Sequence, residues 1–96
     1  MIFGNFVTYE LTIAGSNVSN LDLSKVVTTE KEIRIHSAAA GVRVIFTPIT
    51  STTDASATSY LLSGDEHEFE LGKGLDRISF YNGSGGEVKV SVAVMF

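Results

Sequence analysis

Hydrophobic and polar residues alternate along several short stretches of the chain. The clearest stretch is residues 87–96, where Val88, Val90, Val92 and Val94 are separated by polar or small residues. Because successive residues of a β-strand point to opposite sides of a sheet, this period of two predicts a strand with one face in the core. The same period predicts four further strands, at residues 7–13, 32–36, 66–71 and 77–81.

Residues 42–50 depart from this pattern because both faces of the predicted strand carry apolar side chains. Such a strand is either central to the fold or buried at a contact with another chain. Pro48 has no N–H group for a ladder, so we expect a bend, a bulge or an edge there. On the last strand, Met95 falls on the face opposite the valines. The candidate protein-interface residues are therefore Ile45, Thr47, Ile49 and Met95.

Turn-forming residues separate the predicted strands. The run Asn-Gly-Ser-Gly-Gly at residues 82–86 predicts a β-hairpin between the last two strands. No stretch of ten residues shows helical periodicity. Together these signals predict one all-β domain over residues 1–96, an antiparallel β-sandwich or jelly roll of seven to eight short strands. We expect a further strand at 60–62, short connections at 63–65 and 72–74, and longer loops at 14–20, 37–41 and 51–58.

Composition favours a protein that binds or assembles. Charged residues make up 19% of the chain, below the average of about 25%, and 11 serines and 9 threonines take their place. A surface wetted by hydroxyl groups can be covered by a partner at a low desolvation cost. The net charge of −4 and the scattered basic residues argue against binding to nucleic acid or to an anionic membrane.

Two further features bear on where the chain works. It has no cysteine, which excludes disulfides and thiolate metal sites. The first residues lack both a basic start and a sustained apolar run, so we expect synthesis in a cytoplasm without a signal peptide. No apolar run approaches the length of about 18 residues that a membrane span requires.

The densest polar cluster is residues 65–70, where Glu66, Glu68 and Glu70 alternate with His67 and Phe69. Carboxylates of this kind could hold a calcium ion or supply a general base. However, successive residues on one face of a strand lie about 6 to 7 Å apart, too far for one ion to bridge directly. We therefore interpret the three glutamates as the solvated face of a half-buried strand.

No other residues suggest catalysis. His36 and His67 are the only histidines, and their spacing does not predict a metal site. The serines lack a Gly-x-Ser-x-Gly motif, and no phosphate-binding motif surrounds Ser84. We therefore expect a non-enzymatic protein that needs no metal and no cofactor.

Residues 61–96 also carry a resemblance. They run Leu-Leu-Ser-Gly-Asp-Glu-His-Glu-Phe-Glu-Leu, then Gly-Lys-Gly-Leu-Asp-Arg-Ile-Ser-Phe-Tyr-Asn, then a glycine turn and Glu-Val-Lys-Val-Ser-Val-Ala-Val. In strand order this third of the chain resembles the terminal half of small virion proteins of tailed bacteriophages. The chain is similar in composition to capsid decoration (cement) proteins. No functional residue carries over from this resemblance.

The resemblance implies a structural protein of the virion, made in the host cytoplasm, that stabilises the coat lattice. Its implied partners are the major capsid protein or other virion subunits, together with copies of itself in a symmetric oligomer, for which we expect a trimer. Three alternatives stay open: a small ligand- or carbohydrate-binding module, a phage tail component, and a small enzyme on a jelly roll. The absence of tryptophan counts against a carbohydrate site. A metalloenzyme would need a set of metal ligands that the two histidines do not supply.

Overall fold

The computed structural model of the chain describes residues 4–25, 30–62, 66–72 and 74–96. Within these ranges the secondary structure is entirely β, so no helix that could cross a membrane occurs in them. The eight strands are β1 (Phe6–Ile13), β2 (Val18–Asp22), β3 (Lys31–Ser37), β4 (Val42–Thr47), β5 (Tyr60–Leu61), β6 (Glu66–Leu71), β7 (Arg77–Asn82) and β8 (Val88–Met95).

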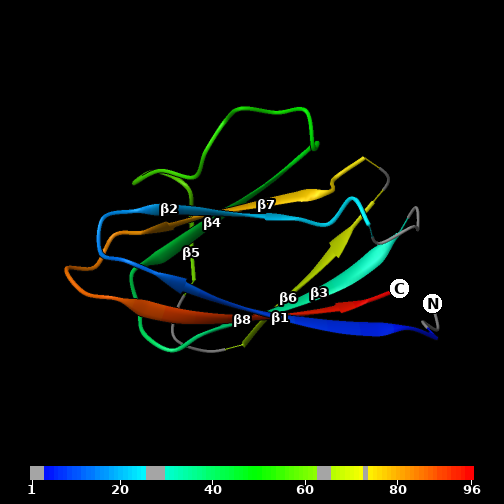
Figure 1. Cartoon of the computed structure of the whole chain (residues 1–96), viewed down its shortest axis with the longest axis horizontal. Coiled ribbons are helices and arrows are strands. Elements are labelled where there is room, and N and C mark those ends of the chain that lie inside the picture. Colours follow the sequence, from blue (N-terminus) through cyan, green and yellow to red (C-terminus); the bar gives the residue numbers. More distant parts are fainter. Residues whose placement is uncertain (1–3, 26–29, 63–65, 73) are drawn as a thin grey trace.

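The strands form two antiparallel sheets that pack face to face (Figure 1). Sheet A has the strand order β1-β8-β3-β6, and sheet B has the order β2-β7-β4-β5. Along the chain, each strand lies in the opposite sheet from the one before it, except that β5 follows β4 within sheet B. This order is that of a jelly roll. The predicted all-β fold, an antiparallel sandwich or jelly roll of seven to eight strands, is confirmed.

The core lies between the sheets and is built by the alternation seen in the sequence. On β8, Val88, Val90, Val92 and Val94 are buried, and β8 is central because it pairs with both β1 and β3. The polar residues between them point outward. The fully buried cluster contains Ile13, Leu23, Ile33, Ile35, Val42, Val44, Leu62, Leu71, Ile78, Phe80, Val88, Val90, Val92 and Val94.

The hairpin predicted at residues 82–86 is wrong. The strands that this segment joins, β7 and β8, belong to different sheets, so the segment crosses from one sheet to the other. The reason is the buried side chain of Asn82. Its amide nitrogen donates to the carbonyl oxygens of Ile13 and Gly86, at 2.9 and 2.8 Å, and its amide oxygen accepts from Ser84. These bonds hold the segment against the end of β1.

Two loops meet backbone to backbone at this end of the sandwich. A Cβ atom on Gly15 would lie 2.8 Å from the carbonyl carbon of Gly85, closer than real side chains come. Next to it, Ser16 has a positive φ of 62°, and its N–H donates to the carbonyl oxygen of Asn82 at 2.9 Å. Glycine at position 15 therefore permits a close approach that any other residue would push apart.

The remaining loop predictions have mixed outcomes. The loop expected at 14–20 is too long, because β2 begins at Val18 and pairs with β7. The short strand expected at 60–62 is present as β5, and β4 ends at Thr47, immediately before Pro48. Residues 63–65 and Lys73, in two predicted connections, lie outside the described residues.

Candidate interaction surface

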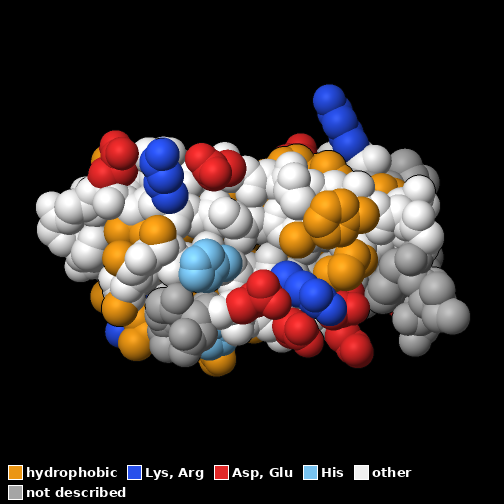
Figure 2. All heavy atoms as spheres, turned by 90° about the horizontal axis from the view of Figure 1, so that it is seen from below, with side chains coloured by type: hydrophobic (Ala, Val, Ile, Leu, Met, Phe, Trp, Pro, Cys, Tyr) orange, Lys and Arg blue, Asp and Glu red, His pale blue; other side chains and the backbone are white. Residues whose placement is uncertain are grey.

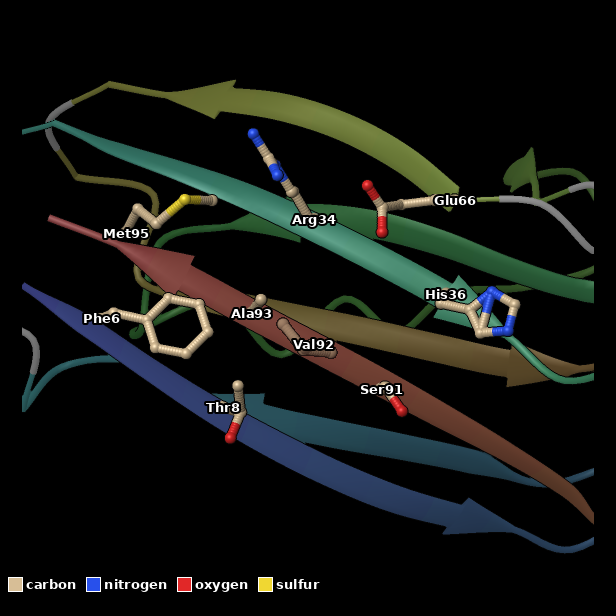
Figure 3. A pocket seen from close by; sticks show the side chains of 9 residues that line it. All are labelled: Phe6, Thr8, Arg34, His36, Glu66, Ser91, Val92, Ala93 and Met95. Atoms are coloured by element: carbon tan, nitrogen blue, oxygen red, sulfur yellow. The ribbon is translucent and has the colours of Figure 1, made fainter. Parts of the chain in front are cut away.

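The outer face of sheet A is open and partly apolar. Phe6 on β1 lies directly opposite Met95 on β8, and Thr8 lies opposite Ala93 in the next row. The ring of Phe6 is on the outside of the sheet, and the residue is 65% exposed. A shallow groove of about 270 Å³ runs across these rows onto β3 and β6 (Figure 3). We call it the outer groove; it is lined by Phe6, Thr8, Arg34, His36, Glu66, Ser91, Val92, Ala93 and Met95.

Acidic side chains border the outer groove on its β3 and β6 side. Arg34 lies 3.4 Å from a carboxylate oxygen of Glu32 and 3.4 Å from one of Glu68. The whole outer face of sheet A carries more acids than bases. Figure 2 looks onto this face and shows hydrophobic side chains beside a mixed group of acidic and basic ones. The outward-pointing charged residues are Glu10, Glu32, Glu66, Glu68 and Glu70 against Arg34 and Lys89.

The outer face of sheet B is different because the chain covers part of it. Residues 48–59, which we call the covering loop, run along the outside of this sheet (Figure 1). Arg77 on β7 is buried beneath the covering loop, with its guanidinium 2.6 Å from the carboxylate of Asp54 and 2.6 Å from the carbonyl oxygen of Thr53. A second anchor joins the N–H of Ala55 to the hydroxyl oxygen of Ser79 at 2.8 Å.

The burial of Arg77 and Ser79 departs from the sequence pattern. Their period predicts a polar, solvated face on β7, but both residues are buried. The covering loop lies over the outer face of this part of β7 and buries the two side chains through polar contacts. The two apolar faces of β4 have the same explanation, because Ile45 lies directly opposite Ser79 in this sheet.

The four predicted interface residues do not come together in the structure. Ile45 and Thr47 are half-buried on the outside of sheet B, and the hydroxyl of Thr47 accepts a hydrogen bond from Arg77 at 3.2 Å. Ile49 is 41% exposed but lies beyond the end of β4. Met95 lies on the other side of the sandwich, in the outer groove. Whether these residues form an interface stays a prediction.

Sequence reasoning missed Phe6, the most exposed of the large hydrophobic residues described. A signal for it was present. The alternation of residues 7–13 extends one position further back and places Phe6 on the outward face with Thr8 and Glu10. Beside Met95 and Ala93, an aromatic residue on the polar face of this strand adds to an exposed apolar patch, which is typical of an interaction surface.

The candidate metal-binding residues remain separate. Glu66, Glu68 and Glu70 are exposed along β6. His36 points outward from sheet A, whereas His67 faces inward, opposite Ile35, so the two histidines lie on opposite faces. Among the described residues, no group of three or more His, Asp or Glu side chains gathers in a way that could hold a metal ion. Asp65 lies outside those residues.

His67 belongs to an aromatic cluster at the open side of the sandwich. Its ring stacks on Phe69, with ring centres 6.3 Å apart, and meets Tyr60 edge-on at 6.0 Å. Phe69 also contacts Phe46, at 4.8 Å. These rings close the gap between the edge strands β5 and β6, which is a packing role.

An ion pair between a buried lysine and a partly exposed aspartate stabilises the end of the sandwich near β3. The side chain of Lys31 is fully buried, and its Nζ lies 2.9 Å from an oxygen of Asp76. The backbone oxygen of Asp76 also accepts from the N–H of Leu23 at 2.7 Å. The charge of Lys31 is thus directed at one carboxylate, and the pair has a structural role.

At the end of β2, Asp22 has a perturbed acidity. Hydrogen bonds from the hydroxyl and the N–H of Ser24 hold the pKa of Asp22 below its ordinary value of 3.8, with a smaller contribution from the charge of Lys25. The N–H bond is 2.7 Å long. Asp22 is exposed and terminates the strand through this turn, so the shift reflects local structure.

Comparisons with known proteins support the fold. One solved structure, described as "Bacillus endospore appendages form a novel family of disulfide-linked pili", matches 100% of this chain and 93% of its own, with a TM-score of 0.55 and 11% sequence identity. At that identity the likeness shows a shared fold. No protein-family model matches the chain, and no curated protein matches its sequence.

Proposed function

We propose that this chain is a non-enzymatic structural subunit that assembles with copies of itself into a larger protein particle. The observation that carries the proposal is the open outer face of sheet A. There the exposed ring of Phe6 lies beside Met95 and Ala93, with no part of the described chain covering it. A contiguous exposed apolar patch with a polar rim is typical of a protein–protein contact.

The structural neighbour supports a role in assembly. That protein is described in connection with pili that form Bacillus endospore appendages, and its fold matches over the whole of this chain. Those pili are disulfide-linked. The present chain has no cysteine, so its own contacts cannot be disulfides and must rest on burial and charge.

For the particle itself, we propose a virion. The ground is the resemblance of residues 61–96 to small tailed-phage virion proteins, and jelly rolls are common among viral capsid domains. In that setting the chain would decorate the coat, with the major capsid protein as its lattice partner and the resemblance implying a trimer. The pilus-like neighbour favours a second candidate, a filament subunit built from copies of the chain alone.

Self-assembly is tested by light scattering of the purified chain across a hundredfold range of concentration. We expect a mass above that of one 10.3 kDa chain, rising with concentration or settling at a fixed multiple. A fixed mass of three chains would support the trimer. A chain that stays monomeric over the whole range would overturn self-assembly.

The particle is identified by immunogold labelling in cells and lysates of the organism that carries the gene. Label on capsids or phage tails would support the virion proposal, and co-sedimentation of the purified chain with unlabelled capsids would identify the lattice partner. Label on cell or spore filaments would overturn the virion proposal and assign the subunit to an appendage.

A further inference from the structure

The covering loop leaves one end of sheet B open, and that end is a second exposed patch. Three residues across β2, β7 and β5 present apolar side chains outward in a single row, with Arg43 of β4 among them. Val18 is 40% exposed and Leu61 is 48% exposed, while Tyr81 is half-buried. We call this set the sheet B row: Val18, Tyr81, Arg43 and Leu61.

The sheet B row and the outer groove are complementary in charge. Arg43 donates to the carbonyl oxygen of Ser59 at 2.8 Å, and no carboxylate of the described residues lies within ion-pair distance of it. The face of sheet A around the outer groove has the opposite excess, since it carries Glu10, Glu32, Glu66, Glu68 and Glu70 against Arg34 and Lys89. The sheet B row therefore combines apolar side chains with a positive charge, and the outer groove combines an apolar strip with an acidic surround.

The apolar part of the outer groove and the sheet B row lie on opposite faces and at opposite ends of the sandwich. Phe6 and Met95 are at the end where the N- and C-terminal strands begin and finish, on sheet A. Val18 and Tyr81 are on sheet B at the other end, beside the loops that Asn82 holds together. Figure 1 shows this separation, with both termini at the right and the β1–β2 connection at the left. One copy therefore cannot bring its own two patches together.

We propose that the outer groove of one copy receives the sheet B row of the next copy. In this contact Val18 and Tyr81, on the adjacent strands β2 and β7, cover Phe6 and Met95, and Arg43, on the next strand β4, faces the acidic β3 and β6 side of the groove. The inference rests on the proposed self-assembly and specifies its geometry. A groove-to-groove contact is disfavoured because each outer face of sheet A carries five carboxylates against two basic side chains, so two such faces repel each other.

A contact between two different patches has a consequence for symmetry. Each added copy leaves one unfilled groove and one unfilled row, so the series either closes into a ring or continues as a filament. Because the patches face in opposite directions, successive copies add in a staggered stack. The proposal thus predicts an open series, in contrast with the closed trimer that the virion resemblance implies.

The test uses two variants that each block one patch. Phe6→Asp places a charge in the outer groove, and Leu61→Asp places one in the sheet B row. Both positions are exposed, so both variants should melt at the wild-type temperature. Thr12→Asp on the outer face of β1 and Thr52→Asp in the covering loop are matched controls, because both residues are exposed and lie outside the patches.

We expect each blocking variant to be monomeric by light scattering and each control to assemble like the wild type. When the two blocking variants are mixed, the intact groove of Leu61→Asp should receive the intact row of Phe6→Asp. This mixture should give a species of two chains and nothing larger. If Phe6→Asp lowers the melting temperature, Glu68→Lys takes its place, since that side chain is 60% exposed on the acidic side of the groove.

The other outcomes are equally decisive. A mixture that remains monomeric overturns the groove-to-row contact. Blocking variants that assemble like the wild type overturn it as well, but they leave the proposed self-assembly standing. A wild-type chain that does not assemble overturns both proposals together.

Discussion

Both outer faces of the sandwich carry an arginine beside carboxylates, but the two arginines differ in what surrounds them. Arg77 on sheet B is buried under the covering loop, 2.6 Å from Asp54, and its guanidinium also bonds Thr53. Arg34 on sheet A is 43% exposed and lies 3.4 Å from each of two glutamates. The chain supplies the cover for one face and leaves the other to the solvent or to a partner.

The comparison shows how a small jelly roll divides its surface between folding and assembly. β7 and β8 are both central strands with one face in the core, and they differ in what lies over the other face. Over β7 the cover is a loop of the same chain, anchored by Arg77 and Ser79. Over β8 no described segment plays this part, so Ala93 and Met95 line a groove. The surfaces that the chain leaves uncovered, the outer groove above all, are the ones suited to a contact with another chain.

The largest expected effect comes from removing the centre of sheet A. Deleting residues 91–96 takes away most of β8, which pairs with β1 and β3 and buries Val92 and Val94. Each buried valine contributes about 1.5 to 3 kcal/mol, and a small domain has only about 5 to 15 kcal/mol in total. The truncated chain should show no cooperative transition in circular dichroism on heating. A sharp melt in that protein would contradict the central role of β8.

The next test compares the covered Arg77 with the exposed Arg34 by replacing each with alanine. Arg77→Ala should lower the free energy of unfolding by about 2 to 3 kcal/mol, since it removes a buried guanidinium together with its hydrogen bonds to Asp54, Thr53 and Thr47. Arg34→Ala should lower it by less than about 1 kcal/mol, as for other surface ion pairs. Urea unfolding of both variants measures the difference. Equal losses would show that the covering loop does not depend on Arg77.

A smaller effect of the same kind is expected at two serines. The buried hydroxyl of Ser79 accepts from the N–H of Ala55, so Ser79→Ala leaves that N–H without its partner. We expect a loss of about 1 to 2 kcal/mol, together with faster proteolysis within the covering loop. Ser91→Ala, on the exposed face of β8, is the matched control and should change stability by no more than about 0.5 kcal/mol. A loss at Ser91 equal to that at Ser79 would contradict the contrast between the faces.

Much of the fold could be predicted from the sequence because its signal is local. The period of two identifies β1, β3, β6, β7 and β8, and it separates the core side of each from the outer side. The change of sheet at residues 82–86 could not be predicted in this way. It depends on a hydrogen bond from Asn82 to Ile13, a residue 69 positions away. In a sequence, a glycine-rich hairpin cannot be told apart from a glycine-rich connection between two sheets.

The candidate surface was less accessible to sequence reasoning, for a related reason. Ile45 is a candidate interface residue in the sequence because both faces of its strand are apolar, which indicates either a central strand or a contact with another chain. Its cover comes in part from the covering loop, which Arg77 anchors through Asp54, 23 residues away. Leu61 does not stand out in the sequence, and its exposure follows from strand pairing. Which apolar residues remain uncovered is decided by tertiary contacts.

The smallest expected effect is on stability at acidic pH, and it comes from Asp22 at the end of β2 in sheet B. The hydrogen bonds from Ser24 stabilise the charged form of Asp22, so its pKa in the folded chain lies below the ordinary value of 3.8. A carboxyl group with a depressed pKa adds stability that is fully present above 3.8 and is lost as the pH falls through the lower folded-state value. Folding should therefore weaken in that acidic window.

The substitution Asp22→Asn keeps an acceptor oxygen for Ser24 but carries no titrating group. Its melting temperature should fall less than that of the wild type between neutral pH and a pH below 3.8. Ser24→Ala removes the hydroxyl bond and keeps the N–H bond, so it should shift the acid transition in the same direction by a smaller amount. Thermal melts across this range measure all three chains. Identical acid transitions in the wild type and Asp22→Asn would show that the turn at Ser24 contributes nothing to acid stability.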